Sequence, residues 1–215
     1  MVLVEFYGPY GCFTRPEMKV ERVSYDVPTP SAIIGMLESI YWHPGMKWVV
    51  DRIYVLNPII HTNIRRNEVK DIVSCSNMKS AMRGNDKPQY IAAGLNILQR
   101  AALILKDVRY VIEAHFDLTN RASDADNSGK FQDIICRRLE KGQCYSMPYL
   151  GTREFPADFK LWPKGKPIET INDTRDLGYM LYSMDYSNPE NIQPTFFHAQ
   201  MYKGVIDLRN VEVLR

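Results

Sequence analysis

Residues 108–118 alternate strictly between two sets of side chains. One set is Val108, Tyr110, Ile112, Ala114, Phe116 and Leu118, and the other is Arg109, Val111, Glu113, His115 and Asp117. Successive side chains of a β-strand point to opposite faces of its sheet. The pattern therefore predicts a strand in a sheet that has one buried face and one open, mostly polar face.

Helical periodicity follows Thr29, which is a suitable N-cap, and Pro30, which fits the first position of a helix. The apolar stripe is Ile33, Ile34, Leu37, Ile40 and Tyr41. This spacing predicts a helix with Tyr41 and Trp42 on its last turn, because His43-Pro44-Gly45 follows at once. A second helix is predicted from near Ser128 to Gly142, since glycine suits the C′ position.

Extended segments are predicted around the two helices. They are Val2–Tyr7, which Gly8-Pro9-Tyr10-Gly11 is expected to end, then Trp48–Leu56, Tyr145–Phe155, Leu177–Met184 and Phe196–Leu208. Glycine, proline and asparagine between these segments are typical of turns, and they set the expected boundaries.

The stretch 59–105 is predicted to be an inserted β-hairpin with two extended arms around a polar tip. Apart from this insertion, the order strand, helix, strand, strand, helix, strand is the split βαβ arrangement of the ferredoxin-like fold. We therefore predict an α+β protein with a ferredoxin-like, RRM-like domain at residues 1–155. Residues 156–215, rich in proline and aromatic side chains, are predicted to form a small β-rich C-terminal subdomain.

Composition excludes several classes of protein. No apolar run approaches the roughly 20 residues needed to span a bilayer, and Glu5 comes too early for a signal peptide. The four cysteines are scattered without a CxxC pair, and no P-loop, GxGxxG, HExxH or GxSxG motif occurs. We therefore expect a cytoplasmic protein with no membrane partner, no bound metal and no cofactor. With a net charge of +2, any surface that binds nucleic acid must be local.

His115 is the first candidate for chemistry, because a histidine on an open sheet face can move a proton near neutral pH. The pattern alone favours a simpler interpretation, in which His115 is a solvated side chain paired with Glu113 or Asp117.

Aromatic and basic side chains elsewhere are candidates for contact with RNA. Tyr41 and Trp42 either stack on bases or cap the core. Arg65 and Arg66 either contact phosphates or are ordinary charged residues of a hairpin. The remaining candidates, Arg137, Arg138 and Lys141, suit the C-terminal end of a helix dipole and also form a possible basic edge. These features fit an RNA-binding enzyme and a small protein-assembly module equally well.

Three stretches resemble the subtype I-C (Dvulg) branch of the CRISPR-associated Cas family 5. They are residues 25–42 (YDVPTPSAIIGMLESIYW), 105–116 (LKDVRYVIEAHF) and 138–155 (RLEKGQCYSMPYLGTREF). Residues 63–68 (NIRRNE) and 196–201 (FFHAQM) add to the resemblance, which spans nearly the whole chain.

The resemblance implies a ferredoxin-like (RAMP) domain and a metal-independent endoribonuclease. Such an enzyme cuts CRISPR repeat RNA at the base of its hairpin to make mature crRNA. It then stays bound as a subunit of the type I-C interference (Cascade) complex, beside the backbone and large subunits. The implied reaction is attack of a ribose 2′-hydroxyl on the adjacent phosphate, which leaves a cyclic phosphate.

The resemblance also implies a catalytic tyrosine, histidine and lysine, and Tyr41 and His115 match the first two. The lysine has no counterpart, since Glu113 and Ala114 precede the histidine. Either another cation takes its place, with Lys106, Arg109 and Arg65 as candidates, or the histidine is assisted differently. The expected RNA-binding residues are Trp42, Arg65, Arg66, Arg137, Arg138 and Lys141. The alternative hypothesis is a non-catalytic scaffold subunit that binds the crRNA 5′ handle.

Overall fold

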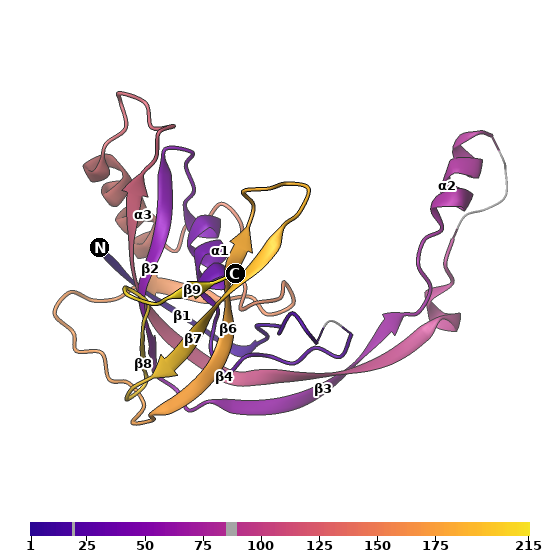
Figure 1. Cartoon of the computed structure of the whole chain (residues 1–215), viewed down its shortest axis with the longest axis horizontal. Helices are drawn as coiled ribbons and strands as arrows, with labels where there is room; N and C mark the ends of the chain where they lie inside the picture. The colour runs from indigo at the N-terminus through magenta and orange to yellow at the C-terminus, as the bar shows by residue number, and fades with distance from the viewer. Residues whose placement is uncertain (19, 85–89) are drawn as a thin grey trace.

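A computed structural model describes residues 1–18, 20–84 and 90–215. In this part the chain is a mixed α and β structure with antiparallel sheets and few helices. Figure 1 shows a body that contains both sheets and a long arm that projects from it. None of the described helices has the length and apolar character needed to cross a membrane.

The larger sheet is organised around one central strand, β4. Its order is β5-β1-β4-β2-β8, and β3 also pairs with β4; all of these pairings are antiparallel. The strands are β1 (Val2–Gly11), β2 (Met46–Val55), β3 (Ile60–Val69), β4 (Ile97–Leu118), β5 (Asp158–Leu161) and β8 (Val205–Asp207).

The predicted alternation in residues 108–118 is confirmed. Tyr110, Ile112 and Ala114 are buried in the hydrophobic core, where helices α1 (Pro30–Ile40) and α3 (Ser128–Lys141) cover the sheet. In the opposite set Arg109 and His115 are partly exposed and Asp117 is exposed, whereas Val111 and Glu113 are buried, so the prediction of an open face is wrong at its middle. β4 therefore presents one apolar face to the helices and one polar face away from them.

Both predicted helices form, and their ends follow the expected capping chemistry. The Thr29 hydroxyl accepts a hydrogen bond from the backbone N–H of Ala32 at 3.2 Å. Gly142 caps α3 with a left-handed φ of 61°, which glycine adopts without steric cost. The prediction for the end of the first helix is wrong by two residues. Helix α1 ends at Ile40, and Tyr41 follows it as an extended C-cap residue.

Two predicted strand limits are also wrong. β1 continues through Gly8–Gly11 and stays paired with β4 as far as Gly11. Pro9 is tolerated there because β5 pairs only with Val4–Tyr7, so one side of β1 is open at the proline. Residues 145–155 contain no strand, only an isolated bridge from Tyr149 to Pro156. The strand beyond β1 in the larger sheet is instead β5.

The arm consists of β3 and the first half of β4, which pair continuously from Ile60–Lys106 to Val69–Ile97. Its outer end carries helix α2 (Cys75–Met82) and a 3-10 turn (Ala93–Leu95), and residues 85–89 lie outside the described residues. β4 runs from the arm into the body as one strand, although two separate segments were predicted. Asp107 has a positive φ of 53° where the two halves meet.

The second sheet contains β6 (Arg175–Asp185), β7 (Gln193–Met201) and β9 (Val213–Leu214). The turn predicted between its first two strands is present, since β6 ends at Asp185 and β7 starts at Gln193. The predicted strand 196–208 is divided in two by a turn with positive φ at Lys203 and Gly204. Its second piece, β8, leaves the small sheet and pairs with β2.

Candidate functional site

His115 forms a hydrogen-bonded pair with Asp51 on the polar face of the larger sheet. Nδ1 of His115 lies 2.7 Å from Oδ2 of Asp51, and the two side chains are 37% and 9% exposed. Because a carboxylate only accepts hydrogen bonds, Nδ1 carries a proton in this pair. Nε2 is then the nitrogen that takes up or releases a proton. It lies 3.9 Å from Oδ1 of the exposed Asp117, beyond hydrogen-bond distance, and the partly exposed ring leaves it available to a ligand.

Asp51 occupies a β-bulge, which explains how a carboxylate from β2 reaches His115. The register of β2 on β4 shifts between Val50 and Arg52, so Asp51 is the additional residue. A bulge redirects a side chain that regular alternation would place elsewhere. Asp51 is not among the site residues predicted from the sequence. A usable signal was present, since Val50 and Ile53 are both apolar and their spacing of three breaks the alternation.

The negative charge of Glu113 is balanced by Arg52, although Glu113 stands where the resemblance implies a lysine. Its Oε2 accepts hydrogen bonds from the Tyr54 hydroxyl at 2.6 Å and from Nη1 of Arg52 at 3.1 Å. The carboxylate is nearly buried, with 9% of the side chain exposed. Glu113 is therefore part of a paired polar network and is not a free negative charge on the sheet face.

The three cations considered as substitutes for the lysine do not lie beside His115. Arg109 is six residues earlier in β4, roughly 20 Å along the strand, and is paired with Glu5 at 2.6 Å. Lys106 and Arg65 are farther away, toward and on the arm. Lys47 is nearer, because it pairs with Asp117 and shares the face of His115. Lys47 is not among the cations predicted from the sequence.

Tyr41 lies on the helix side of the sheet, in the hydrophobic core, with 8% of its surface exposed. Its ring is 6.1 Å from the Phe131 ring and 5.0 Å from the guanidinium carbon of Arg138. Burial raises the pKa of its hydroxyl above the usual value, against the lowering effect of Arg138. The hydroxyl is therefore protonated at neutral pH and can donate a hydrogen bond.

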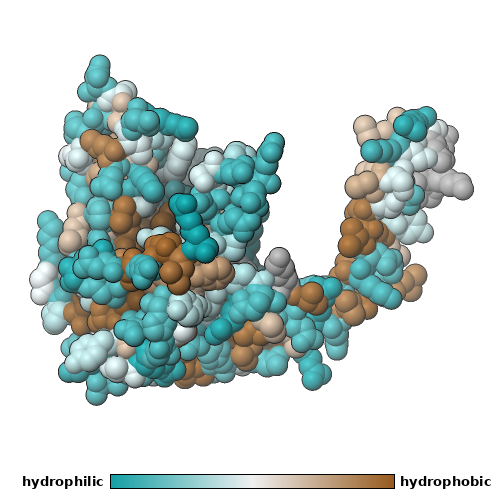
Figure 2. Space-filling view, in the orientation of Figure 1, coloured by the Kyte–Doolittle hydropathy of each residue, from teal (hydrophilic) through white to brown (hydrophobic). Residues whose placement is uncertain are grey.

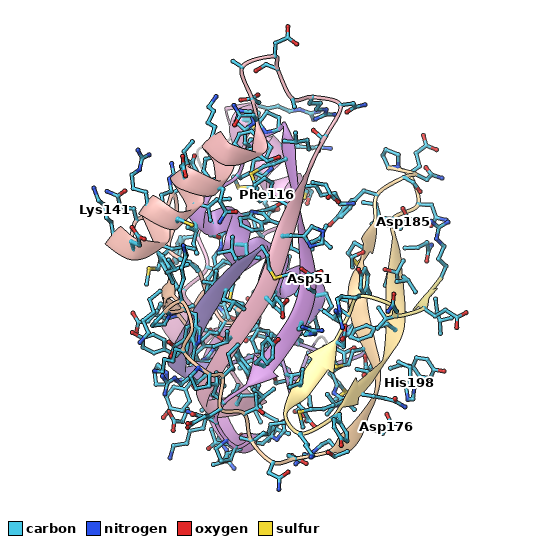
Figure 3. The ribbon with its side chains drawn as sticks, turned by 90° about the vertical axis from the view of Figure 1, so that its left-hand side faces the viewer. Asp51, Phe116, Lys141, Asp176, Asp185 and His198 are labelled. Atoms are coloured by element: carbon cyan, nitrogen blue, oxygen red, sulfur yellow. The ribbon has the colours of Figure 1, made fainter. Side chains whose placement is uncertain are left out.

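The structure does not bring Tyr41 and His115 together. Phe116 stacks edge-on against Phe131, so it points toward α3, and the preceding residue His115 points to the opposite face. Both residues lie near the end of the sheet at Leu118, since Trp48 pairs with Phe116 and donates to the Tyr41 carbonyl oxygen. In Figure 3, α3 and Phe116 lie on one side of the strands that carry this site.

Four of the six expected RNA-binding residues gather at the ends of α1 and α3. Trp42 is 59% exposed, and Arg138 donates to the carbonyl oxygen of Ile40 at 2.5 Å. Arg137 and Lys141 are exposed on the last turns of α3. Lys141 points away from the sheet at the outer end of this helix (Figure 3). These residues share the Tyr41 side of the molecule.

The other two, Arg65 and Arg66, lie on the arm and differ in their surroundings. Arg66 forms an ion pair with Glu154, and its guanidinium carbon is 5.0 Å from the Phe155 ring centroid. Arg65 is exposed and has no hydrogen-bond or ion-pair partner among the described residues. Arg65 is therefore the more available of the two for a phosphate.

Other arrangements of ionisable side chains are less suited to chemistry. His198 also pairs with a carboxylate, Asp176, at 2.9 Å, but 58% of that aspartate is exposed and it lies on the small sheet. Within residues 1–18, 20–84 and 90–215, no group of three or more His, Cys, Asp or Glu side chains is arranged to hold a metal ion.

Comparison with known proteins places the chain in a family. The profile of the family described as CRISPR-associated protein (Cas_Cas5) matches residues 1–209. The chain belongs to the Cas5d family. The CRISPR pre-crRNA endoribonuclease Cas5d of Mannheimia succiniciproducens is 44% identical, over 96% of this chain and 94% of that protein. The protein of the same name from Thermus thermophilus is 39% identical, over 95% and 90%.

A solved structure agrees with the fold of this Cas5d-family chain. The crystal structure of a CRISPR-associated protein matches it with a TM-score of 0.70 and 23% identity, over 97% of this chain and 91% of that one. This likeness supports the arrangement of sheets and helices throughout the body.

Proposed function

We propose that the chain is a metal-independent endoribonuclease that cleaves CRISPR repeat RNA at the base of its hairpin to make mature crRNA. It then stays bound as a subunit of the type I-C interference (Cascade) complex in the cytoplasm. The activity is the one for which both Cas5d relatives are named. The observation that carries the chemistry is the accessible Nε2 of His115, held in one tautomer by Asp51.

The proposed reaction needs one proton removed and one delivered. The ribose 2′-oxygen attacks the adjacent phosphorus while Nε2 of His115 takes the 2′-hydroxyl proton. The bond from phosphorus to the 5′-oxygen breaks, and that oxygen takes a proton from water, which leaves a 2′,3′-cyclic phosphate and a 5′-hydroxyl. The Asp51 carboxylate stabilises the imidazolium that forms, because it accepts a hydrogen bond from Nδ1–H throughout.

The negative charge on the phosphate requires a cation near His115. Lys47 is the candidate, because the register of β2 on β4 places it on the same face of the sheet as His115. Diagonal neighbours on adjacent strands lie about 7–8 Å apart, which is within reach of a lysine side chain. Tyr41, on the other face, is proposed to act through its protonated hydroxyl on RNA that passes around the end of the sheet. Arg138, Trp42, Arg137 and Lys141 would hold the RNA on that side.

The finer fold assignment is part of the proposal. A ferredoxin-like domain with 59–105 as an inserted hairpin is supported by the strand order, but its last strand, β5, lies beyond the expected boundary at residue 155. In the unit β1-α1-β2 the two strands are parallel and β4 lies between them. In the unit β4-α3-β5 the two strands are parallel and β1 lies between them. Two such units form the split βαβ arrangement. Residues 156–215 would form the C-terminal subdomain, although they also add β5 and β8 to the larger sheet.

The arm is proposed to contact other subunits of the complex. Its outer part exposes apolar side chains, including Ile72 (91% exposed), Met82 (85%) and Leu95 (88%). Exposure of these side chains to water is unfavourable for the chain alone. Figure 2 shows apolar surface where the arm approaches α2. Exposed apolar patches of this kind mark interaction sites.

The experiment that tests the function is incubation of the chain with its own repeat RNA in the presence of a chelator. We expect one cut at the base of the hairpin and a product ending in a cyclic phosphate, detected by its resistance to phosphatase until acid opens the ring. RNA that is bound but stays intact, with or without added metal, would establish the scaffold alternative and reject the enzyme.

Replacing Arg65 by Ala is expected to weaken binding of repeat RNA and to reduce the slope of log affinity against log salt by about 0.7–0.9, the value for one phosphate contact. The reason is that Arg65 is exposed and unpaired, so its charge is available. Filter binding at several salt concentrations measures the slope. Arg215→Ala removes the same charge from the small-sheet side and serves as the control. Equal slopes for the two variants would rule out this contact.

A further inference from the structure

A groove lies between the C-terminal half of α1 and the segment that follows α3, and the proton chemistry above does not use it. It has a volume of about 700 Å³, and its lining includes Gly35, Glu38, Ser39, Trp42, Arg138 and Tyr145. This volume falls in the range of small-molecule binding sites, about 300–1,000 Å³. The groove is therefore large enough for a single nucleotide.

Two aromatic side chains border the groove and are exposed to solvent. Tyr145 is 89% exposed and Trp42 is 59% exposed, whereas the other two tryptophans, Trp48 and Trp162, are buried. Large aromatic surfaces in water are unfavourable unless a ligand covers them. Flat rings beside a cationic side chain are typical of sites that stack unpaired bases of RNA.

The walls of the groove are held in place by hydrogen bonds to the end of α1. The backbone N–H groups of Tyr145 and Ser146 donate to the Ser39 carbonyl oxygen at 2.9 and 3.1 Å. Arg138 donates to the Ile40 carbonyl oxygen from the other wall. Both walls are thus hydrogen-bonded to carbonyl groups at the C-terminal end of α1, which have no partner within the helix. The site is therefore organised before a ligand binds.

Glu38 supplies a hydrogen-bond acceptor in this groove. It is half-buried, and it has no hydrogen bond or ion pair within the described part of the chain. Burial raises the pKa of its carboxyl group above the usual value. A carboxylate with both oxygens free is matched by two adjacent N–H donors on one edge of a ligand. Among the four RNA bases, only guanine presents such a pair, N1–H and N2–H, on its Watson–Crick edge.

We propose that Trp42, Tyr145 and Glu38 form a binding site for one unpaired guanine of RNA. The rings of Trp42 and Tyr145 stack on the base, and Glu38 accepts hydrogen bonds from its N1–H and N2–H. Arg138, with Arg137 and Lys141 on the same turns of α3, attracts the flanking phosphates. This inference rests on the proposed function and deepens it, because the guanine belongs to an unpaired part of the same repeat RNA.

Tryptophan fluorescence tests the site directly, because Trp42 is the exposed one of the three tryptophans. The full chain is titrated with the pentaribonucleotides UUGUU, UUAUU, UUCUU and UUUUU, which have no hairpin. We expect quenching by the stacked base, with UUGUU binding about tenfold more tightly than the others. A matched bidentate contact gives discrimination of this order.

Two variants and one control separate the roles. Glu38→Gln is expected to remove the guanine preference while quenching persists, because an amide offers only one acceptor. Tyr145→Ala is expected to weaken binding of all four oligonucleotides by roughly 5- to 100-fold through lost stacking. Tyr202→Ala removes another exposed tyrosine (65%), which directly follows β7 of the small sheet, and should change nothing.

Equal affinity of the wild type for the four oligonucleotides would overturn the assignment of guanine. Absence of quenching by any of them, in a preparation that still cleaves the hairpin repeat, would overturn the groove as an RNA site and leave the proposed function intact. Conversely, guanine-selective quenching in a preparation that never cleaves the repeat would support the groove and reject the enzyme.

Discussion

Replacing His115 by Ala is expected to lower the rate of repeat-RNA cleavage by roughly 10²- to 10⁴-fold, the usual contribution of a general acid or base. Affinity for the RNA should stay near that of the wild type, because the imidazole contacts the reacting proton and does not hold phosphates. Single-turnover cleavage with excess protein measures the rate, and filter binding measures the affinity in the same buffer.

Asp51→Asn refines this expectation. The asparagine keeps the shape of the side chain but no longer requires a proton on Nδ1 of His115, so the ring is free to turn or change tautomer. We expect a smaller loss of rate, roughly tenfold or more, together with an altered pH dependence of cleavage and unchanged RNA affinity. A merely structural role for Asp51 would leave the shape of the pH profile as it is.

His198→Ala is the matched control, since His198 also pairs with an aspartate but lies on the small sheet. It should cleave at the wild-type rate. Full activity of His115→Ala would remove His115 from the mechanism and direct attention to Tyr41 and the cations on its side of the sheet.

Replacing Phe131 by Ala is expected to lower the free energy of unfolding by about 3–5 kcal/mol. Phe131 is fully buried in α3, and its ring contacts the rings of Tyr41, His43 and Phe116. Removing it leaves a cavity at the point where α3, the end of α1 and β4 meet. Urea denaturation followed by circular dichroism measures the change at constant protein concentration.

Phe196→Ala provides the comparison, because this phenylalanine on β7 is only half-buried. Phe196→Ala should lower the free energy of unfolding by less than half as much as Phe131→Ala does. A loss below about 1 kcal/mol for Phe131→Ala would mean that α3 contributes little to the stability of the body, contrary to its buried contacts.

The sequence predicted the two main helices and the two faces of the central strand, because their signals are local. Thr29, Pro30 and Gly142 act through the backbone within a few residues of themselves. The alternation of residues 108–118 similarly indicates which side chains face the helices, although it does not show that Val111 and Glu113 on the other face are also buried. Such features depend on short-range geometry, which a single sequence displays directly.

The errors arose where a distant strand decided the outcome. Gly8–Gly11 reads as a turn, but pairing with β4 keeps this segment extended. Asp51 reaches His115 only because a bulge on β2 redirects it. The separation of Tyr41 from His115 depends on which side of the sheet α1 covers, and no pattern within either segment records that.

The central position of β4 also affects when the body can fold during synthesis. Val2 pairs with Ala114, and both strands that flank β1 lie at residue 97 or later in the chain. The first strand, made almost a hundred residues before any partner, waits unpaired on the ribosome while the arm is synthesised. Closing so long a loop slows folding. Until it closes, the apolar strand β1 can form non-native contacts. Rapid translation through the arm would shorten this period.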